Sequence, residues 1–334
     1  MLVSVIAVLG LVAVSSAVEP KYEFVEEWQV WKSRHEKIYD THLVELEKHL
    51  TWLSNKKYIE QHNANSHIFG FTLAMNKFGD MTELEWTDYL STYQVREQNE
   101  NGNYSKTFQP ESQVYDYPEA VDWRTKGAVT AVKDQGDCGA SYAFSAMGAL
   151  EGAYALAHGG NRESLSEQNI IDCSIPYGNH GCHGGNMYDA FLYVIANDGV
   201  SKESAYPFFG KQSYCNYQKT YRGTSMSGSV SIKSGSEEDL LTAVANVGPV
   251  SVAIDGANSA FRFYYSGVYD SSRCTSSSLN HAMVITGYGS YSGKKYWLAK
   301  NSWGTNWGQS GFVMMARDKY NQCGIASDAS YPTL

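Results

Sequence analysis

The sequence lacks cysteine in its first 137 residues, has no cluster of Lys and Arg, and has no long apolar run after its first 14 residues. With no basic cluster and a formal net charge of −9, the chain shows no sign of nucleic-acid binding. The absence of a later apolar run predicts no membrane-spanning helix. A hydrophobic content of 43% with 18% charged residues instead indicates a globular protein.

The N-terminal residues are typical of a secretory signal peptide. Residues 2–14 are almost wholly apolar, and Ser15, Ser16 and Ala17 follow as a small-residue cleavage site. We therefore predict a signal peptide over residues 1–17 and a secreted protein. A membrane anchor is the alternative, but the run is short for a bilayer.

The six cysteines all lie in the remainder of the chain. An even number in a secreted protein predicts three disulfides, and the sequence by itself allows about 15 pairings. They are Cys138, Cys173, Cys182, Cys215, Cys274 and Cys323.

Residues 18–115 differ in character from the rest of the chain. Residues 18–95 are rich in charge and predict helices, with Leu46, Leu50, Leu53 and Ile59 at helical spacing within 45–63. Residues 96–115 are polar and predict an exposed, cleavable linker. That linker contains the sequon Asn103-Tyr104-Ser105, so we expect glycosylation at Asn103.

Residues 116–334 predict an α+β domain with two subdomains. A strong helical pattern covers 141–156, and the second half contains short β-rich segments at 230–232, 250–254, 282–288, 296–301 and 311–315. A helix-rich half beside a strand-rich half favours a cleft between them as the site.

The most informative motif is the run Cys138-Gly139-Ala140-Ser141-Tyr142. It matches the signature around a cysteine-protease nucleophile, with serine in place of the reactive cysteine. Gly136 and Gly139 permit a tight turn before the helix. Ser141 then begins the helix, where free N–H groups favour negative charge. The Gln135 side chain and the Ser141 N–H are the expected oxyanion hole.

The partners of Ser141 are expected in the strand-rich half. His281 begins a predicted strand and is the candidate base. The Asn301 amide oxygen is expected to hold its imidazole in the useful tautomer, and Trp303 to shield that bond from water. Because a serine hydroxyl is not ionised as a thiol is, it needs this base during attack.

From about residue 22 to the C-terminus the chain resembles the papain family, and within it the cathepsin L group. The matching residues are Gly181-Cys182-His183-Gly184-Gly185, Asn55, Ile59 and Asn63 with Trp52 and Lys48, and Asn76, Phe78 and Asp80. Val44 and Ala74 depart from the pro-region motifs, where an acidic residue and a glycine are usual.

The resemblance implies a papain-like α+β fold, with a helical inhibitory pro-region and linker over 18–115 and a mature domain over 116–334. It also implies a substrate cleft that includes Gly184, Gly185, Met187 and Leu279. The implied disulfides are Cys138–Cys182, Cys173–Cys215 and Cys274–Cys323, since the family normally has one further, unpaired cysteine as its nucleophile.

One subgroup of that family, the silicateins of sponge spicules, has serine at this position, and Ala140-Ser141-Tyr142 resembles it. This resemblance implies hydrolysis and polycondensation of silicic acid or silicon alkoxides, contact with growing silica, and self-assembly into filaments. A weak serine-type endopeptidase and a non-catalytic filament protein that templates silica are the alternatives.

Two serine-rich stretches are candidate silica-binding surfaces. Residues 271–278 contain five serines just before His281, and Ser225, Ser227, Ser229 and Ser231 alternate with other residues as on one face of a strand. Ordinary loop polarity and a half-exposed strand explain them equally well. Among the histidines of the predicted mature domain, which are His158, His180, His183 and His281, no pair has metal-ligand spacing beside free cysteines, so we predict neither a metal nor another cofactor.

Overall fold

The computed structural model describes residues 25–90, 92–95, 105–109 and 117–334. The predicted signal peptide, Asn103 and the start of the predicted mature domain at residue 116 lie outside these residues. The chain divides into two units, Met1–His49 and Leu50–Leu334. In the described ranges no helix is long and apolar enough to cross a membrane.

The first unit contains helix α1 (Val25–Arg34) and the start of helix α2 (His42–Asn63). Its interior is aromatic: the ring of Trp28 stacks on Trp31, Tyr39 and His49 at centroid distances of 5.1, 5.9 and 4.9 Å. Lys32 forms an ion pair with Glu45. The packing of a few large aromatic rings therefore stabilises this unit, which has few aliphatic residues to bury.

Within the second unit, α2 buries a face that differs from the predicted one. Leu50 is 57% exposed, whereas Trp52, Asn55 and Ile59 are buried. The leucine pattern predicted the helix correctly but not its buried face. Asn55 is buried because its amide donates to the carbonyl oxygens of Gly79 and Met81, 2.8 and 3.0 Å away.

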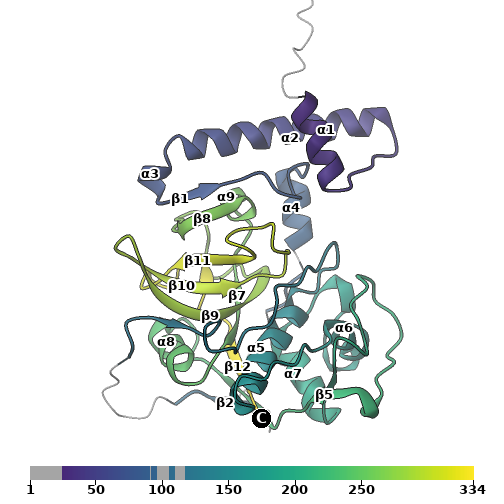
Figure 1. Ribbon diagram of the computed structural model, residues 1–334, viewed down its shortest axis with the longest axis vertical. Helices are drawn as coiled ribbons and strands as arrows, with labels where there is room; N and C mark the ends of the chain where they lie inside the picture. The colour runs from purple at the N-terminus through teal and green to yellow at the C-terminus, as the bar shows by residue number, and fades with distance from the viewer. Residues whose placement is uncertain (1–24, 91, 96–104, 110–116) are drawn as a thin grey trace, which may run out of the picture. The chain divides into compact units, whose positions relative to one another are not determined.

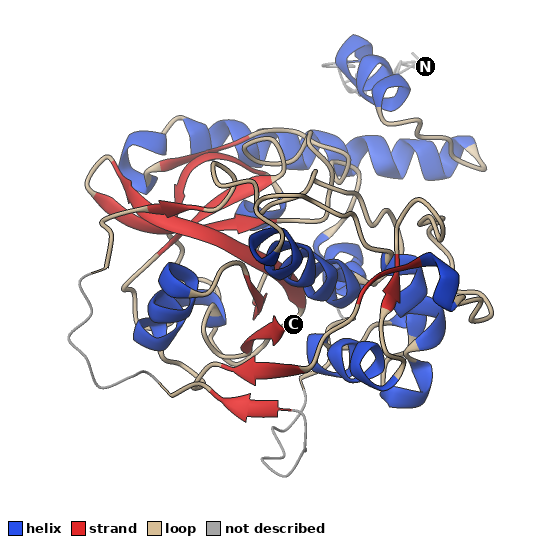
Figure 2. Cartoon of the chain, turned by 60° about the horizontal axis from the view of Figure 1, so that its bottom comes forward, coloured by secondary structure: helices blue, strands red, loops and turns tan. Residues whose placement is uncertain are grey.

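A large mixed sheet forms the centre of the second unit (Figures 1 and 2). Its strand order is β1-β8-β11-β10-β9-β7-β12-β6-β2, with β3 paired to β9. Strands β6, β7, β9, β10 and β11 were predicted to within a few residues, whereas β8 and β12 were not predicted. Their bounds are β6 Gly228–Ser231, β7 Val250–Ile254, β8 Tyr264–Tyr269, β9 His281–Tyr291, β10 Lys294–Lys300, β11 Phe312–Ala316 and β12 Ala329–Thr333.

The short strands were not predicted. They are β1 Phe71–Leu73, β2 Ser105–Thr107 and β3 Val121–Asp122, with the separate pair β4 Val200–Ser201 and β5 Arg222–Thr224. Strand β2 lies in the predicted exposed linker, where it pairs in parallel with β6. Its pairing depends on a partner more than 100 residues away, which a local pattern does not reveal.

Helices cover the sheet and form the second subdomain (Figures 1 and 2). Their bounds are α3 Ser66–Phe69, α4 Glu83–Leu90, α5 Ser141–Ala157, α6 Glu167–Cys173, α7 Met187–Ala196, α8 Glu237–Asn246 and α9 Ser259–Arg262. Short 3₁₀ turns occur at Ile175–Tyr177, Gly181–His183, Lys219–Tyr221 and Gln322–Gly324. Helix α5 packs against β9 and lies between the helical side and the sheet. Gly148 allows this approach, because an added Cβ would lie 2.8 Å from the Val284 side chain.

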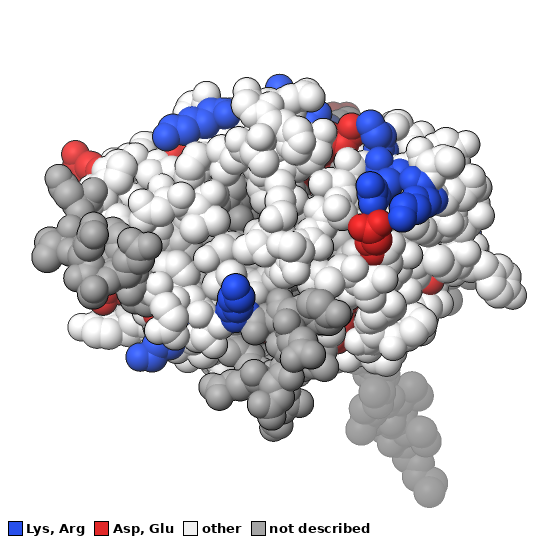
Figure 3. Space-filling model, turned by 90° about the horizontal axis from the view of Figure 1, so that it is seen from below, with Lys and Arg blue, Asp and Glu red and all other residues white. Residues whose placement is uncertain are grey.

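The predicted hydroxyl face at 225–231 is not present. Only Gly228–Ser231 form a strand, and it lies inside the sheet between β12 and β2. Ser229 is 3% exposed and Ser227 is exposed, so the hydroxyls do not share one solvent face. The surface seen in Figure 3 carries its charged side chains in small separate groups.

Candidate active site

Ser141 is the first residue of α5, with Ala140 as N-cap. The turn before it depends on glycine: Gly136 has a φ of +54°, and a Cβ at Gly139 would lie 2.6 Å from the Cys182 carbonyl oxygen. The N–H of Ala282 donates to Ser141 Oγ at 3.2 Å. The hydroxyl therefore lies at a helix N-terminus and against the first residues of β9.

His281 is the first residue of β9 and contacts Asn301, which directly follows β10. Its Nε2 lies 2.8 Å from Asn301 Oδ1, and the same oxygen accepts from the Ser302 N–H at 2.8 Å. Two donors thus face this oxygen, so Nε2 carries the proton and Nδ1 keeps its lone pair. The Trp303 ring stacks on the imidazole at 4.4 Å, as a shield would.

Burial sets the charge state of His281. The ring is 1% exposed, and burial lowers the pKa of His281 to about 4 against the opposing effect of the Asn301 hydrogen bond. The imidazole is therefore neutral near pH 7. Among the described residues no hydrogen bond joins it to the Ser141 hydroxyl; Ala282, next to it in the chain, makes that contact instead.

Gln135 is fixed beside Ser141 from both sides. Its backbone N–H donates to the Ser302 carbonyl at 2.8 Å, and its Oε1 accepts from Ser302 Oγ at 2.6 Å. Its Nε2 donates one hydrogen to the Cys138 carbonyl at 3.0 Å. Among the described residues, the second hydrogen of this nitrogen has no partner, and its role as an oxyanion donor stays a prediction.

The pro-region covers this site. The Gly185 N–H donates to the Thr92 carbonyl, and the Gln94 N–H to the Gly185 carbonyl, both at 3.0 Å. Tyr89 Oη donates to the Gly136 carbonyl at 2.9 Å. Gly184 is required because a Cβ there would collide with the Thr92 carbonyl oxygen. With this segment in place, Ser141 is only 2% exposed.

Arg262 anchors the pro-region to the sheet side of the unit. Its guanidinium is fully buried and donates to the Met81 carbonyl at 2.8 Å and to Asn55 Oδ1 at 3.1 Å, and it forms an ion pair with Glu83 at 3.1 Å. Its own carbonyl accepts from Asn76 Nδ2 at 2.7 Å. The pro-region asparagines found in the sequence are thus satisfied by backbone and side-chain partners.

The two further cleft residues implied by the resemblance are buried. Met187 begins α7 and Leu279 lies two residues before His281; both belong to the same apolar cluster as Tyr93 of the pro-region. Tyr93 Oη donates to Asp328 Oδ2 at 2.6 Å. Asp328 was not predicted, because a single aspartate among small residues near the C-terminus has no pattern that would mark it.

The six cysteines form three disulfides in the structure: Cys138–Cys182, Cys173–Cys215 and Cys274–Cys323. These are the pairs that the family resemblance implies. The first ties the turn before Ser141 to the cleft glycines. Within the described residues, no group of three His, Cys, Asp or Glu side chains is arranged to hold a metal ion.

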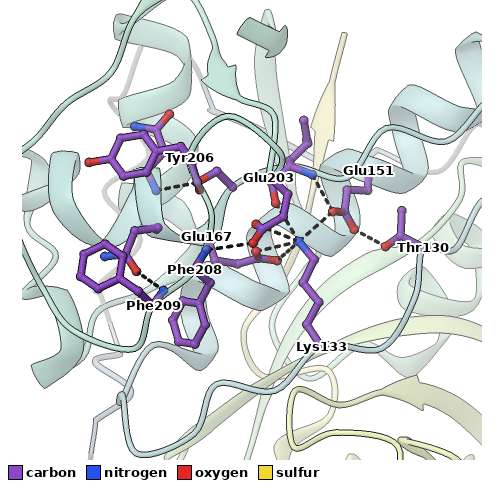
Figure 4. A network of polar contacts seen from close by, with 12 residues as sticks. Thr130, Lys133, Glu151, Glu167, Glu203, Tyr206, Phe208 and Phe209 are labelled. Carbon is purple, nitrogen blue, oxygen red and sulfur yellow. Dashed lines mark hydrogen bonds and ion pairs between the residues drawn. The ribbon is translucent and has the colours of Figure 1, made fainter. Parts of the chain in front are cut away.

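A buried ionic cluster lies behind the site (Figure 4). Lys133 Nζ lies 2.7 Å from Glu167, 3.3 Å from Glu151 and 3.5 Å from Glu203. Glu151 belongs to α5, ten residues after Ser141, and also binds Thr130, whose hydroxyl accepts from Lys300 Nζ at 2.9 Å. The cluster therefore fixes α5 relative to the strand that leads to Asn301.

The pKa shifts in this cluster follow from the balance between burial and the opposite charges of neighbouring side chains. Burial by itself would lower the pKa of Lys133, but the surrounding carboxylates together raise it. Burial raises the pKa of Glu167 against the opposing charge of Lys133, and it lowers the pKa of Lys300. Sequence reasoning missed these residues because they are scattered over residues 130–300.

The fold and site define a peptidase homologue with a bound pro-region, and the chain belongs to the papain family of cysteine proteases. A papain family model matches residues 117–333, and a cathepsin propeptide inhibitor domain matches residues 28–86. Relatives of the cathepsin L type match nearly the whole chain, so the protein is a cathepsin L-like member of that family. The propeptide and the disulfides indicate a secreted or lysosomal protein.

Among curated relatives, the chain is 48% identical to a protein called silicatein from Petrosia ficiformis, over 93% of this chain and 95% of that one. It is 42% identical to cathepsin L of Sarcophaga peregrina, over 98% of each chain. Among solved structures it is similar to digestive procathepsin L 3 of Tenebrio molitor, with a TM-score of 0.86 and 41% identity, over 94% of this chain and all of that one.

Proposed function

We propose that the processed domain condenses silica, with the Ser141 hydroxyl as nucleophile and His281 as general base. The observation that carries this proposal is a hydroxyl at the helix N-terminus, in a site whose neutral imidazole is held by Asn301 with its Nδ1 lone pair free. The 48% identity to a protein called silicatein supports it. On the same ground we propose that this protein is secreted, associates with silica and assembles into filaments.

The chemistry uses the ability of silicon to accept a fifth oxygen. Ser141 Oγ attacks the silicon of an alkoxide or of silicic acid while its proton passes to His281 Nδ1. The silicon–oxygen bond to the departing alkoxide or hydroxide breaks, and the imidazolium returns the proton to it as alcohol or water. Water or a second silanol then attacks the silyl-serine, which regenerates Ser141 and releases a silanol or a siloxane.

Acid–base help of this kind contributes about 10²–10⁴-fold to a rate. The second hydrogen of Gln135 Nε2 and the Ser141 N–H are the donors for the negative charge that develops on the silicon substituents. Gln135 and Ser141 are each 2% exposed in the pro-form, so we expect the activity to require removal of the pro-region.

The test uses tetraethoxysilane and four proteins, each folded as the full chain and then cleaved in the 96–115 linker: wild type, Ser141→Ala, His281→Ala and Ser141→Cys. The silica formed is collected by centrifugation, dissolved in alkali and measured as molybdate-reactive silicon. We expect Ser141→Ala and His281→Ala to fall by about a hundredfold toward the uncatalysed rate. Silica formation that is unchanged in both variants would overturn the proposal and favour surface templating.

A second candidate is a weak serine-type endopeptidase. It is favoured by the extended pro-segment, whose backbone pairs with Gly185 as an extended peptide ligand does. Peptide turnover by the wild type that disappears in Ser141→Ala would establish it. Ser141→Cys is the positive control, because a thiolate at this turn restores the nucleophile that the fold accommodates.

A further inference from the structure

Strand β6 is covered on one edge by a piece of the linker. Its neighbours in the sheet are β12 on one side and the three-residue strand β2 on the other. Ser105 of β2 pairs in parallel with Ser229 of β6, and the N–H of Phe108 donates to the Ser231 carbonyl at 2.8 Å. Removal of β2 would therefore leave the backbone groups on this edge of β6 without partners.

The ring of Phe108 covers apolar surface beside the same edge. It meets the Tyr331 ring edge-on, with the ring centroids 6.4 Å apart. Tyr331 is buried in the core of the sheet, and Val230 of β6 packs against that core as a partly buried residue. Loss of β2 would expose apolar atoms of Tyr331 and Val230. The opened edge would then offer backbone hydrogen-bonding groups next to an apolar rim, which is what an added strand requires.

The edge is longer than the strand itself. The Ser227 N–H donates to the Thr333 carbonyl and the Ile232 N–H donates to the Ala329 carbonyl, both at 2.8 Å. These two bonds continue the pairing with β12 beyond both ends of β6. The edge that faces β2 thus covers residues 227–232, which is about 20 Å of extended backbone.

Strand β6 lacks the features that keep exposed edges from pairing. Although the chain has a net charge of −9, residues 225–232 contain no charged residue and no proline. Strand β2, in contrast, is short and carries the exposed Lys106. Short strands and lysines are the means by which native sheets protect their edges. The full chain therefore ends its sheet in a protected strand that covers an unprotected one.

We propose that the β6 edge is an assembly surface, closed by β2 in the full chain and paired with the β6 edge of a second copy once residues 105–109 are removed. Antiparallel pairing about a two-fold axis near Val230 is self-complementary and continues the sheet across two molecules. It places Val230 and Tyr331 of both copies where the Phe108 ring lies in the full chain. No charges along the strand oppose one another.

The position of the maturation cut then decides whether the surface opens. A cut within 110–115 separates β2 from the mature domain together with the pro-region, whereas a cut within 96–104 leaves β2 attached. This inference rests on the proposed assembly of the processed protein and names one contact for it. It involves neither Ser141 nor silica.

The test uses full chains, in which the pro-region still covers the cleft. In one variant, residues 105–109 are replaced by a Gly-Ser stretch of the same length. The matched control replaces residues 97–101 in the same way, and a third protein adds Ser231→Lys to the 105–109 replacement. Sedimentation velocity over a range of concentrations gives the mass, circular dichroism confirms folding, and hydrogen exchange reports the amides of 227–232.

We expect the wild type and the 97–101 control to stay monomeric where the 105–109 variant is mainly dimeric, a fall of at least about tenfold in the dissociation constant of the dimer. Ser231→Lys should restore the monomer, because like charges then lie close across the two-fold axis. In that monomer the amides of 227–232 should exchange faster than in the wild type, and in the dimer they should be protected again.

Three results would overturn the proposal. The first is an equal mass for the wild type and the 105–109 variant. The second is a dimer that Ser231→Lys leaves intact. The third is a wild-type dimer that is lost on replacement of 105–109, which would mean that two copies exchange β2. If filaments of the processed protein form although the 105–109 variant stays monomeric, this contact is wrong and the proposed assembly stands.

Discussion

Asn301 Oδ1 accepts hydrogen bonds from both the His281 ring and the Ser302 N–H, each at 2.8 Å. The hydrogen bond from the Ser302 N–H fixes the position of this oxygen. The hydrogen bond between the oxygen and His281 then fixes the orientation of the imidazole. A side chain without this oxygen would leave the buried ring free to take the other tautomer, in which Nδ1 carries the proton and is no longer a base.

Asn301→Ala should therefore lower the rate of silica formation by about tenfold to a hundredfold, within the range of acid–base contributions. In the Ser141→Cys background, the same change should shift the pH dependence of thiol alkylation, which reports the pairing of the thiol with His281. An alkylation profile that is identical with and without Asn301 would show that the amide does not orient the ring.

The lowered pKa of His281, about 4, predicts that the stability of the pro-form depends on pH. A group whose pKa falls from its ordinary value of 6.5 on folding adds stability above pH 6.5, and this is lost as the pH falls through 4. The contribution is about 3 kcal/mol. Acid should thus weaken the covered state of the cleft.

The measurement is the unfolding free energy of the full chain at pH 7 and pH 4, for wild type and His281→Gln. The loss on acidification should be smaller in His281→Gln, because glutamine does not take up a proton. His158→Gln is the control, since that histidine is exposed and contacts Tyr154. Equal losses in all three proteins would contradict the prediction.

The ionic cluster around Lys133 predicts a large and specific loss of stability. Lys133→Met leaves Glu151 and Glu167 buried without their cation, which typically costs about 3–5 kcal/mol. Lys202→Met is the matched control: its pair with Glu163 is partly exposed, so the expected loss is much smaller than that of Lys133→Met. Denaturant midpoints of the full chain compare the two, and similar shifts would mean that the cluster adds nothing beyond a surface pair.

The contacts of Arg262 predict how tightly the pro-region is held. Arg262→Met removes the donors to the Met81 carbonyl and to Asn55, so the pro-region of a chain cleaved in the 96–115 linker should dissociate about tenfold faster or more. Arg124→Met, on an exposed pair with Asp122, should leave the dissociation rate unchanged. The rate is read from the fluorescence change as the tryptophans of the pro-region separate.

Local patterns in the sequence predicted the elements that carry the site. Ser141 was expected to begin a helix and does so, because glycines and a disulfide-forming cysteine precede an apolar helical run. The strand at 250–254 was predicted to the residue, since the β-branched residues Val250, Val252 and Ile254 alternate there with the small residues Ser251 and Ala253. Both features depend on neighbours in the chain.

What the sequence did not reveal depends on distant partners. The buried face of α2 is polar at Asn55 because Gly79 and Met81 offer carbonyl oxygens, which no helical pattern encodes. Strands β1 and β2 have three residues each and exist through pairing with β8 and β6. Asp328 could not be picked out from the sequence, because its hydrogen-bond partner, the Tyr93 hydroxyl, lies 235 residues away in the chain.

The disulfide between Cys138 and Cys182 has one more consequence. In a cysteine protease a reactive thiolate at position 141 would lie three residues from this bond, open to oxidation and to thiol–disulfide exchange. Here every cysteine forms a disulfide, and the side-chain atom at the candidate nucleophile position is an oxygen. Iodoacetamide should leave the native chain unlabelled and add one equivalent to Ser141→Cys once the cleft is uncovered. The proposed serine site therefore needs no reducing partner, and its hydroxyl should survive long exposure to oxygenated water.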